Sequence, residues 1–249
     1  ARARQHRSEG ADVIDLGCLP ATPFPHLEDA VRALKREGHT VSVDTPDPQE
    51  LLRGGRAGAD YLLSLNIDTL WVADEVDAIP VLIPDTPGDL DSLRRVVDLM
   101  LERGKPFFAD PILEPIHFGL TASIVRFHDL RRSHPDIPVM MGVGNLTELT
   151  DADTSGINAL LFGIISELRI GAVLATEVSP HARRAEDAHP VADLEIRHPL
   201  TDCLDDAGRF RSQAARQIDR IQPAAMIGVD IVQSDRMMPH PHLARTGRR

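Results

Sequence analysis

Four short polar side chains stand at the ends of apolar stretches, where side chains from different stretches can meet around a small molecule. They are Asp44, Asn66, Asp110 and Asn145. An aspartate can accept two parallel hydrogen bonds from an amidine-like edge, and an asparagine can donate and accept at once. A flat heterocycle with N–H donors and ring-nitrogen acceptors requires this combination. Any one aspartate alone could be a helix cap or a turn residue, so the set as a whole carries the argument.

Among the segments that carry these four residues, FFADPILEPIHFG, residues 107–119, has the most unusual pattern. An apolar stretch runs into Asp110, and Pro111 and Pro115 follow within five residues. Proline fixes one backbone torsion angle, so two prolines stiffen the loop that follows the aspartate. We therefore expect Asp110 to be buried and held in a fixed position facing a ligand.

Apolar runs and helix-like patterns alternate along the chain from residue 11 to residue 188. The runs read as strands buried on both faces, which is typical of a parallel sheet covered by helices. No G-x-G-x-x-G motif follows a strand, so the dinucleotide-binding pattern is absent and a (β/α)₈ barrel is favoured. The expected strands are 11–17, 40–45, 60–66, 80–85, 106–111, 138–145 and 172–178. The expected helices are 25–38, 47–58, 68–77, 89–104, 120–134, 155–169 and 179–188.

This pattern supplies only seven strands, and residues 1–10 resemble the end of a helix. We therefore expect the first strand of the barrel to lie outside this chain. The alternation ends near residue 188, so we predict a barrel domain over 1–188 and a C-terminal extension of unknown role over 189–249. Within the extension, 205–221 is predicted as a helix and 224–232 as a strand or a helix.

Composition excludes several classes of partner. The formal net charge of -11 argues against nucleic acid and anionic membrane surfaces, which attract basic proteins. No apolar run is long enough to cross a bilayer. Two cysteines, Cys18 and Cys203, are too few for a disulfide framework, so a reducing cytoplasm is expected. His117 and His128 lack a third partner in the sequence, and no metal site is predicted.

Five segments resemble successive strands of the pterin-binding barrel superfamily, which includes dihydropteroate synthase and the methyltetrahydrofolate:corrinoid methyltransferases. They are ADVIDLG, VSVDT, GADYLLSLN, FFADP and PVMMGVGN, within residues 10–185. The resemblance implies a pterin or folate-type ligand as the substrate, with Asp44, Asn66 and Asp110 holding the pteridine ring. It implies that Asp110 pairs with the 2-amino and N3 edge. Barrels of this superfamily are often dimers, so it also implies a homodimer as one expected assembly.

The sequence can be compared separately with the methyltransferases and with the synthases of the superfamily. ADPILEPIHFG and GVGNLTE resemble the methyltransferases, which implies that Asn145 lies near N5 of a folate and acts with Asp110 in catalysis. The synthases have a lysine after their seventh strand, but no lysine follows Lys105 here. Glu177 stands where the synthases carry a basic residue for the pyrophosphate. Arg183 and Arg184 on the next predicted helix would replace that charge only in part.

The sequence thus resembles a synthase that keeps the pterin half of its site and lacks the usual phosphate half. We predict a dihydropteroate synthase-like transferase of folate, tetrahydromethanopterin or one-carbon metabolism. Two alternatives remain open. One is a methyltetrahydropterin:corrinoid methyltransferase, which would need a separate corrinoid protein because no D-x-H-x-x-G signature occurs. The other is a non-catalytic pterin-binding protein.

Overall fold

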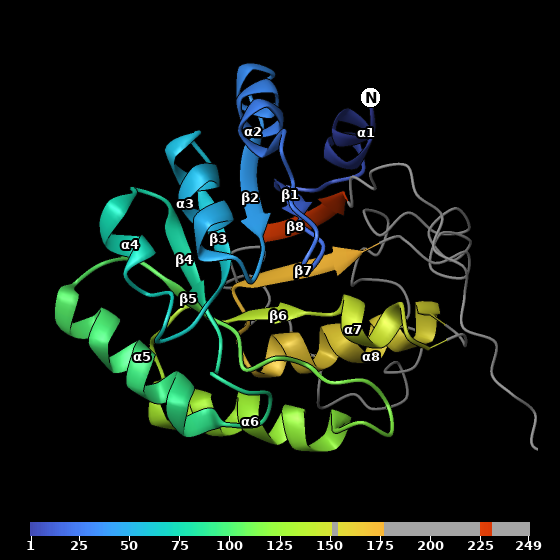
Figure 1. The fold of residues 1–249 in the computed structure, drawn as a ribbon. Coiled ribbons are helices and arrows are strands. Elements are labelled where there is room, and N and C mark those ends of the chain that lie inside the picture. The colour runs from blue at the N-terminus through green and yellow to red at the C-terminus, as the bar shows by residue number, and fades with distance from the viewer. Residues whose placement is uncertain (151–153, 177–224, 231–249) are drawn as a thin grey trace, which may run out of the picture.

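The computed structural model describes residues 1–150, 154–176 and 225–230. Parallel strands form the centre of the molecule and helices surround them (Figure 1). The strands are β1 Val13–Gly17, β2 Thr40–Asp44, β3 Tyr61–Leu65, β4 Ile79–Leu82, β5 Phe108–Ala109, β6 Met140–Gly142, β7 Ala172–Thr176 and β8 Ala225–Asp230. The helices are α1 Arg2–Ser8, α2 Leu27–Arg36, α3 Pro48–Arg56, α4 Val72–Glu75, α5 Leu90–Arg103, α6 Leu120–Ser133, α7 Gly144–Thr147 and α8 Thr154–Glu167.

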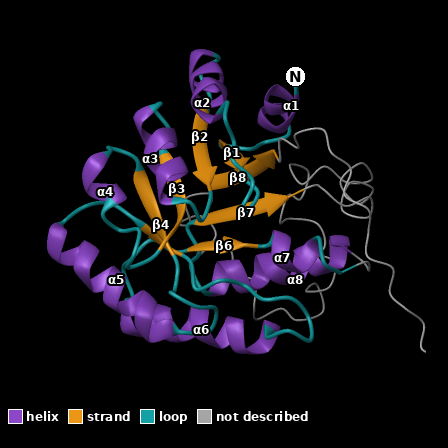
Figure 2. Ribbon diagram, in the orientation of Figure 1, coloured by secondary structure: helices purple, strands orange, loops and turns teal. Residues whose placement is uncertain are grey.

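The strands form one parallel sheet in the order β5-β4-β3-β2-β1-β8-β7-β6. Its two ends approach each other, because Ala109 of β5 makes a parallel bridge with Val139, the residue before β6. The amide of Ala109 also donates a hydrogen bond of 3.0 Å to the Pro138 carbonyl. The alternation of strand and helix in the sequence (Figure 2) therefore produces the expected α/β barrel architecture.

The eighth strand is where the sequence prediction was wrong. We expected it before residue 1, but β8 comes from residues 225–230 and lies between β1 and β7. Its register sets Asp230 opposite Leu16 on one side and Val229 opposite Thr176 on the other. Without β8, the edges of β1 and β7 that face each other would have unpaired backbone groups. A short apolar segment from far along the chain pairs with them. The remainder of 189–249 lies outside the described residues, so the domain boundary near 188 stays a prediction.

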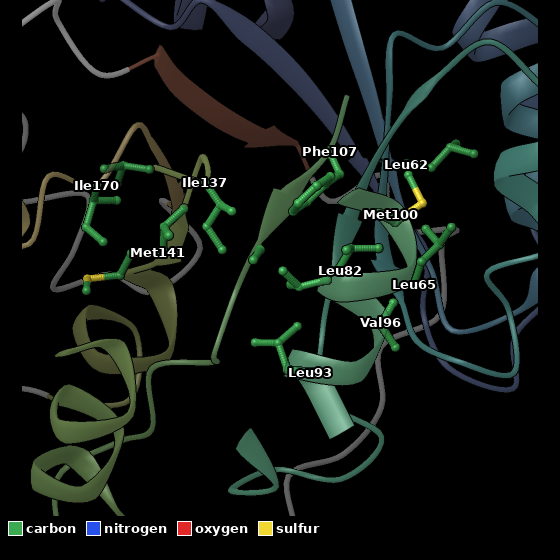
Figure 3. Close-up of a cluster of buried hydrophobic side chains, with 14 of the residues drawn as sticks. Leu62, Leu65, Leu82, Leu93, Val96, Met100, Phe107, Ile137, Met141 and Ile170 are labelled. Carbon is green, nitrogen blue, oxygen red and sulfur yellow. The ribbon is translucent and has the colours of Figure 1, made fainter. Parts of the chain in front are cut away.

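The main core lies between the outer face of the sheet and the helices. Leu93, Val96 and Met100 of α5 are completely buried and point toward Leu62 and Leu82 of the sheet (Figure 3). Each such side chain contributes about 1.5–3 kcal/mol on burial. Helix α5 is also capped at both ends: the Asp89 carboxylate accepts a bond of 3.0 Å from the Ser92 amide, and Gly104 adopts a left-handed conformation.

A second, smaller cluster consists of strand residues only, so it fills the interior of the barrel. Its members are Val13, Leu63, Val81, Met140 and Ala172, with Tyr61, Phe108 and Leu174 packed against them. Successive strand residues alternate between the two faces of a sheet, so residues two positions further along point into the same interior. Asp15 follows Val13 in this way, Asp110 follows Phe108, and Gly142 follows Met140. The interior is therefore apolar at its base and acidic toward the carboxyl ends of the strands.

Candidate functional site

Asp110 lies directly after β5 and is 8% exposed. Its Oδ1 accepts a hydrogen bond of 2.8 Å from the Ile112 amide. Burial raises the pKa of this carboxyl to about 7; the Ile112 and Gly142 amides oppose that rise, and the negative charge of Asp44 adds to it. Near neutral pH, Asp110 therefore exchanges between an acid that can donate and a carboxylate that can accept.

An ion pair holds the loop that carries Asp110. The guanidinium of Arg126 on α6 donates a bond of 2.7 Å to Glu114 and one of 3.0 Å to the Ile112 carbonyl. Ile112 has a φ of 66°, a conformation that bulky residues rarely adopt. Gly119 has a φ of +125°, which residues with a side chain rarely adopt, and a Cβ there would also lie 2.5 Å from the Glu114 carboxylate. The loop is therefore held by partly buried polar contacts in addition to its prolines.

Asp44 and Asp15 form a pair of carboxyl groups on neighbouring strands. Asp44 ends β2, and its Oδ1 accepts a bond of 2.6 Å from the Ser64 hydroxyl. Asp15, in the middle of β1, is fully buried and accepts a bond of 2.5 Å from the Ser42 hydroxyl. Burial raises the pKa of Asp44, and burial together with the charge of Asp44 raises the pKa of Asp15 to about 8. Asp15 is thus predominantly a neutral acid at neutral pH.

Sequence reasoning missed Asp15 and Ser64. The signal for Asp15 was an aspartate inside an otherwise apolar run, at an alternate position shared with Val13. Ser64 had no sequence signal. Its φ is 73°, and the pairing of β3 with β4 shifts register between Leu62 and Leu65. This irregularity turns the Ser64 hydroxyl toward Asp44.

The structure places Asn66 in a local turn. Its Oδ1 accepts bonds of 3.1 Å from the Asp68 amide and 3.3 Å from the Thr69 amide. The Thr69 hydroxyl is a third donor to the same oxygen, at 3.2 Å. These contacts shape the connection from β3 to α4, so the side-chain oxygen is already occupied. A role for Asn66 in holding a ring remains a prediction.

Asn145 lies on α7 and is exposed, and its Nδ2 donates a bond of 2.9 Å to the Leu113 carbonyl. It thus ties the segment after β6 to the loop that carries Asp110. Nearby, a Cβ added to Gly142 would lie 3.8 Å from Asp110 Oδ2, its one neighbour within 4 Å in the described part of the chain. The glycine leaves space in the interior beside the second oxygen of Asp110. Glu177, Arg183 and Arg184 lie outside the described residues.

Cys18 follows β1 and is half-buried. Burial, followed by the nearby carboxylate of Glu50, raises the pKa of its thiol to about 12. The thiol is therefore protonated and a poor nucleophile. No group of three metal-ligating side chains occurs among the residues that the structure describes.

The carboxyl groups of Asp15, Asp44 and Asp110 have no basic partner among the residues that the structure describes. Lys35 and Lys105 pair instead with Asp60 and Asp74. Arg126, on the loop's own helix, pairs with Glu114. Carboxylate oxygens that have no basic partner among the described residues can accept hydrogen bonds from a ligand.

A cleft of about 610 Å³ lies at the opposite end of the barrel, where β2, β3 and β4 begin. Thr40, Asp60, Tyr61 and Ile79 contribute to its lining. In barrels of this kind, ligands and catalytic residues occupy the carboxyl ends of the strands. We therefore place the candidate site at the carboxyl groups and not in this cleft.

Comparison with solved structures assigns the fold. The dihydropteroate synthase of Thermus thermophilus in complex with 6HMPPP superposes with a TM-score of 0.57 at 19% identity, over 76% of this chain and 87% of that one. The Coxiella burnetii dihydropteroate synthase in complex with pteroic acid gives a TM-score of 0.54 at 18% identity, over 75% and 82%. The fold of this chain is therefore the dihydropteroate synthase barrel.

Sequence comparison adds one relative. An uncharacterized protein of Methanocaldococcus jannaschii is 33% identical over 190 residues. The match covers 68% of this chain and 36% of the relative, so the chain spans about a third of that protein's length. No protein-family model matches the chain. Among the described residues, no helix is long and apolar enough to span a membrane.

Proposed function

We propose that this chain binds a pterin at the carboxyl ends of its strands, as a dihydropteroate synthase-like transferase of folate, tetrahydromethanopterin or one-carbon metabolism. The observation that carries the proposal is the buried carboxyl of Asp110, which faces the interior beside Gly142. Its two oxygens can accept the 2-amino and N3 hydrogens of a pteridine. A small pterin is the proposed partner, in a cytoplasmic setting, and the proposal requires no metal.

The roles of the other residues follow from their contacts. Asp44, oriented by Ser64, supplies a second acceptor on the far side of the interior. Asn145 keeps the Asp110 loop against α7 through its bond to the Leu113 carbonyl. Asp110 and Asn145 are therefore the proposed catalytic pair. Asn66 contributes through the shape of its turn.

The likeness to synthases that bind 6HMPPP and pteroic acid supports the pterin proposal. The absence of a basic side chain at the described carboxyl groups favours a divergent reaction over the usual pyrophosphate release. A methyltransferase with a separate corrinoid partner remains the second candidate, because Asn145 stands near the mouth. Consumption of a bound methyl-pterin on addition of a corrinoid protein would establish it.

Calorimetry with a 7,8-dihydropterin tests the proposal. Asp110→Asn keeps the shape of the side chain but turns an acceptor into a donor, so it should weaken binding by about 2–5 kcal/mol. Asp85→Asn is the matched control, because Asp85 follows the neighbouring strand β4 but is exposed. It should change binding by less than about 0.5 kcal/mol, and Arg183→Ala with Arg184→Ala should cost less than about 1 kcal/mol. A larger effect from the arginine pair would mean that the site is built around a phosphate.

A further inference from the structure

Most of the large apolar side chains that are exposed in the described chain stand at one end of the barrel. Six of these nine residues lie in connections that follow a strand: Leu19 after β1, Ile67 and Trp71 after β3, Ile116 and Phe118 after β5, and Leu149 after β6. All the strands run parallel, so these connections leave them at the same end. We call the six residues the apolar rim. Single exposed apolar residues are ordinary, but a concentration of them on one face marks an interaction surface.

The same connections carry acidic side chains and neither lysine nor arginine. The described connections after β1 to β6 are residues 18–26, 45–47, 66–71, 83–89, 110–119 and 143–150. Besides Asp110, their acidic residues are Asp47, Asp68, Asp85, Asp89, Glu114 and Glu148. Arg95 and Arg126 reach Asp85 and Glu114 from α5 and α6. A partner whose charge and polarity match this end of the barrel is therefore both basic and apolar.

Residues 231–249, IVQSDRMMPHPHLARTGRR, have both properties in their sequence. Four arginines and one aspartate give this segment a formal charge of +3, in a protein whose net charge is -11. Its large apolar residues are Ile231, Val232, Met237, Met238 and Leu243. Methionine is flexible and adapts to irregular apolar surfaces, so the Met237–Met238 pair suits a rim built from separate loops.

The segment also starts at the right place. Strand β8 ends at Asp230, between β1 and β7, and its carboxyl end lies at the same end of the barrel as the rim. Strand β3, which precedes Trp71, is three strands from β8, roughly 15 Å around the barrel. Met237 is seven residues beyond Asp230, and an extended chain of that length spans up to about 25 Å. Covalent attachment keeps the segment at a high effective concentration near the rim.

We propose that residues 231–249 dock on the apolar rim of their own chain. Met237 and Met238 contact the rim, and the arginines lie over the acidic connections. The docked segment stands between the candidate site and solvent. This inference goes beyond pterin binding and does not depend on it, so its test requires no pterin.

Fluorescence of Trp71 tests the docking. Trp71 is the only tryptophan of the chain and belongs to the rim, where it is 41% exposed. In the full chain, Met237→Ser combined with Met238→Ser should shift its emission to longer wavelength and strengthen its quenching by acrylamide, because the ring loses apolar cover. Thr246→Ala, in the same segment, is the matched control and should change neither. Added salt should strengthen quenching in wild type, since it screens the arginines.

Tryptic cleavage of the segment tests which surface it occupies. Cleavage after Arg236 and Arg245, followed by mass spectrometry, tracks the undocked fraction when docking is fast. Phe118→Ser removes an apolar side chain from the rim. Val125→Ser is the matched control, because Val125 is exposed on α6 and lies outside the rim. Phe118→Ser should speed cleavage at least about fivefold, and Val125→Ser should leave its rate unchanged.

The proposal is wrong if the two methionine changes leave Trp71 emission and quenching as in wild type, or if Phe118→Ser and Val125→Ser speed cleavage equally. Quenching in wild type that varies with protein concentration would assign the rim to a second copy, which also overturns docking within one chain. Thermal unfolding of each variant identifies a folding defect. The salt dependence of Trp71 quenching needs no substitution, so it tests the docking even where a variant fails to fold.

Discussion

The Ser42 hydroxyl donates a hydrogen bond of 2.5 Å to the carboxyl group of Asp15, and both side chains are completely buried. This contact satisfies one oxygen of an acid that no described basic group neutralises. Burial therefore favours the protonated form of Asp15, and the stability of the fold should depend on pH.

Asp15→Asn should flatten the dependence of stability on pH. The pKa of Asp15 is about 8 in the folded chain against an ordinary 3.8, so the unfolded chain binds fewer protons between these values. The contribution of protonated Asp15 to the free energy of unfolding is therefore fully present below pH 4, and it is lost as the pH rises through 8. Asparagine can still accept from Ser42 and never ionises. Urea unfolding should show a variant more stable than wild type by on the order of 1–3 kcal/mol at pH 8, and by less at pH 5. If the free energy of unfolding of Asp15→Asn depends on pH as steeply as that of wild type, this account is wrong.

Pterin affinity should rise with pH through neutrality. The pKa of Asp110 is about 7, and only its carboxylate accepts both hydrogen bonds of the pteridine edge. About a tenth of the molecules carry the carboxylate at pH 6 and about nine tenths at pH 8, so affinity should increase roughly tenfold. Calorimetry with 7,8-dihydropterin at pH 6, 7 and 8 measures this. Asp110→Asn, which cannot ionise, should lose the dependence.

The ion pair beneath the Asp110 loop should be important for stability. Glu114 and Arg126 have side chains that are 21% and 11% exposed, so Glu114→Gln removes a charge from a mostly desolvated pair. We expect a loss of about 1–3 kcal/mol in the free energy of unfolding. Addition of Arg126→Met to that variant should cost less than Arg126→Met alone, since the two residues interact directly.

Asp91→Asn supplies the control for that measurement. Asp91 pairs with Arg94 three residues along the same helix, at 2.9 Å, but its side chain is 79% exposed. Solvent screens such a pair, so its loss should cost less than about 0.5 kcal/mol. Equal losses for Glu114→Gln and Asp91→Asn would show that burial does not strengthen the loop's ion pair.

The sequence alone determined the elements whose causes are local. Apolar runs that alternate with helical spacing predicted β1 to β7, because periodicity depends only on neighbouring residues. Asp44 and Asp110 could be named as candidate site residues for the same reason, since each ends such a run. The residues at which α5 begins and ends, Asp89 and Gly104, could also be recognised from the sequence.

Tertiary structure decided what depends on distant partners. β8 was ambiguous in the sequence and its place between β1 and β7 was not foreseen, because strand pairing joins segments some two hundred residues apart. Asp15 joins the candidate site because register turns it inward beside Asp44. Asn66 had the expected residue type, yet Asp68 and Thr69 supply nearer donors for its oxygen. Residue type and position show which groups can bind a ligand, but packing and hydrogen bonding determine which of them remain free to do so.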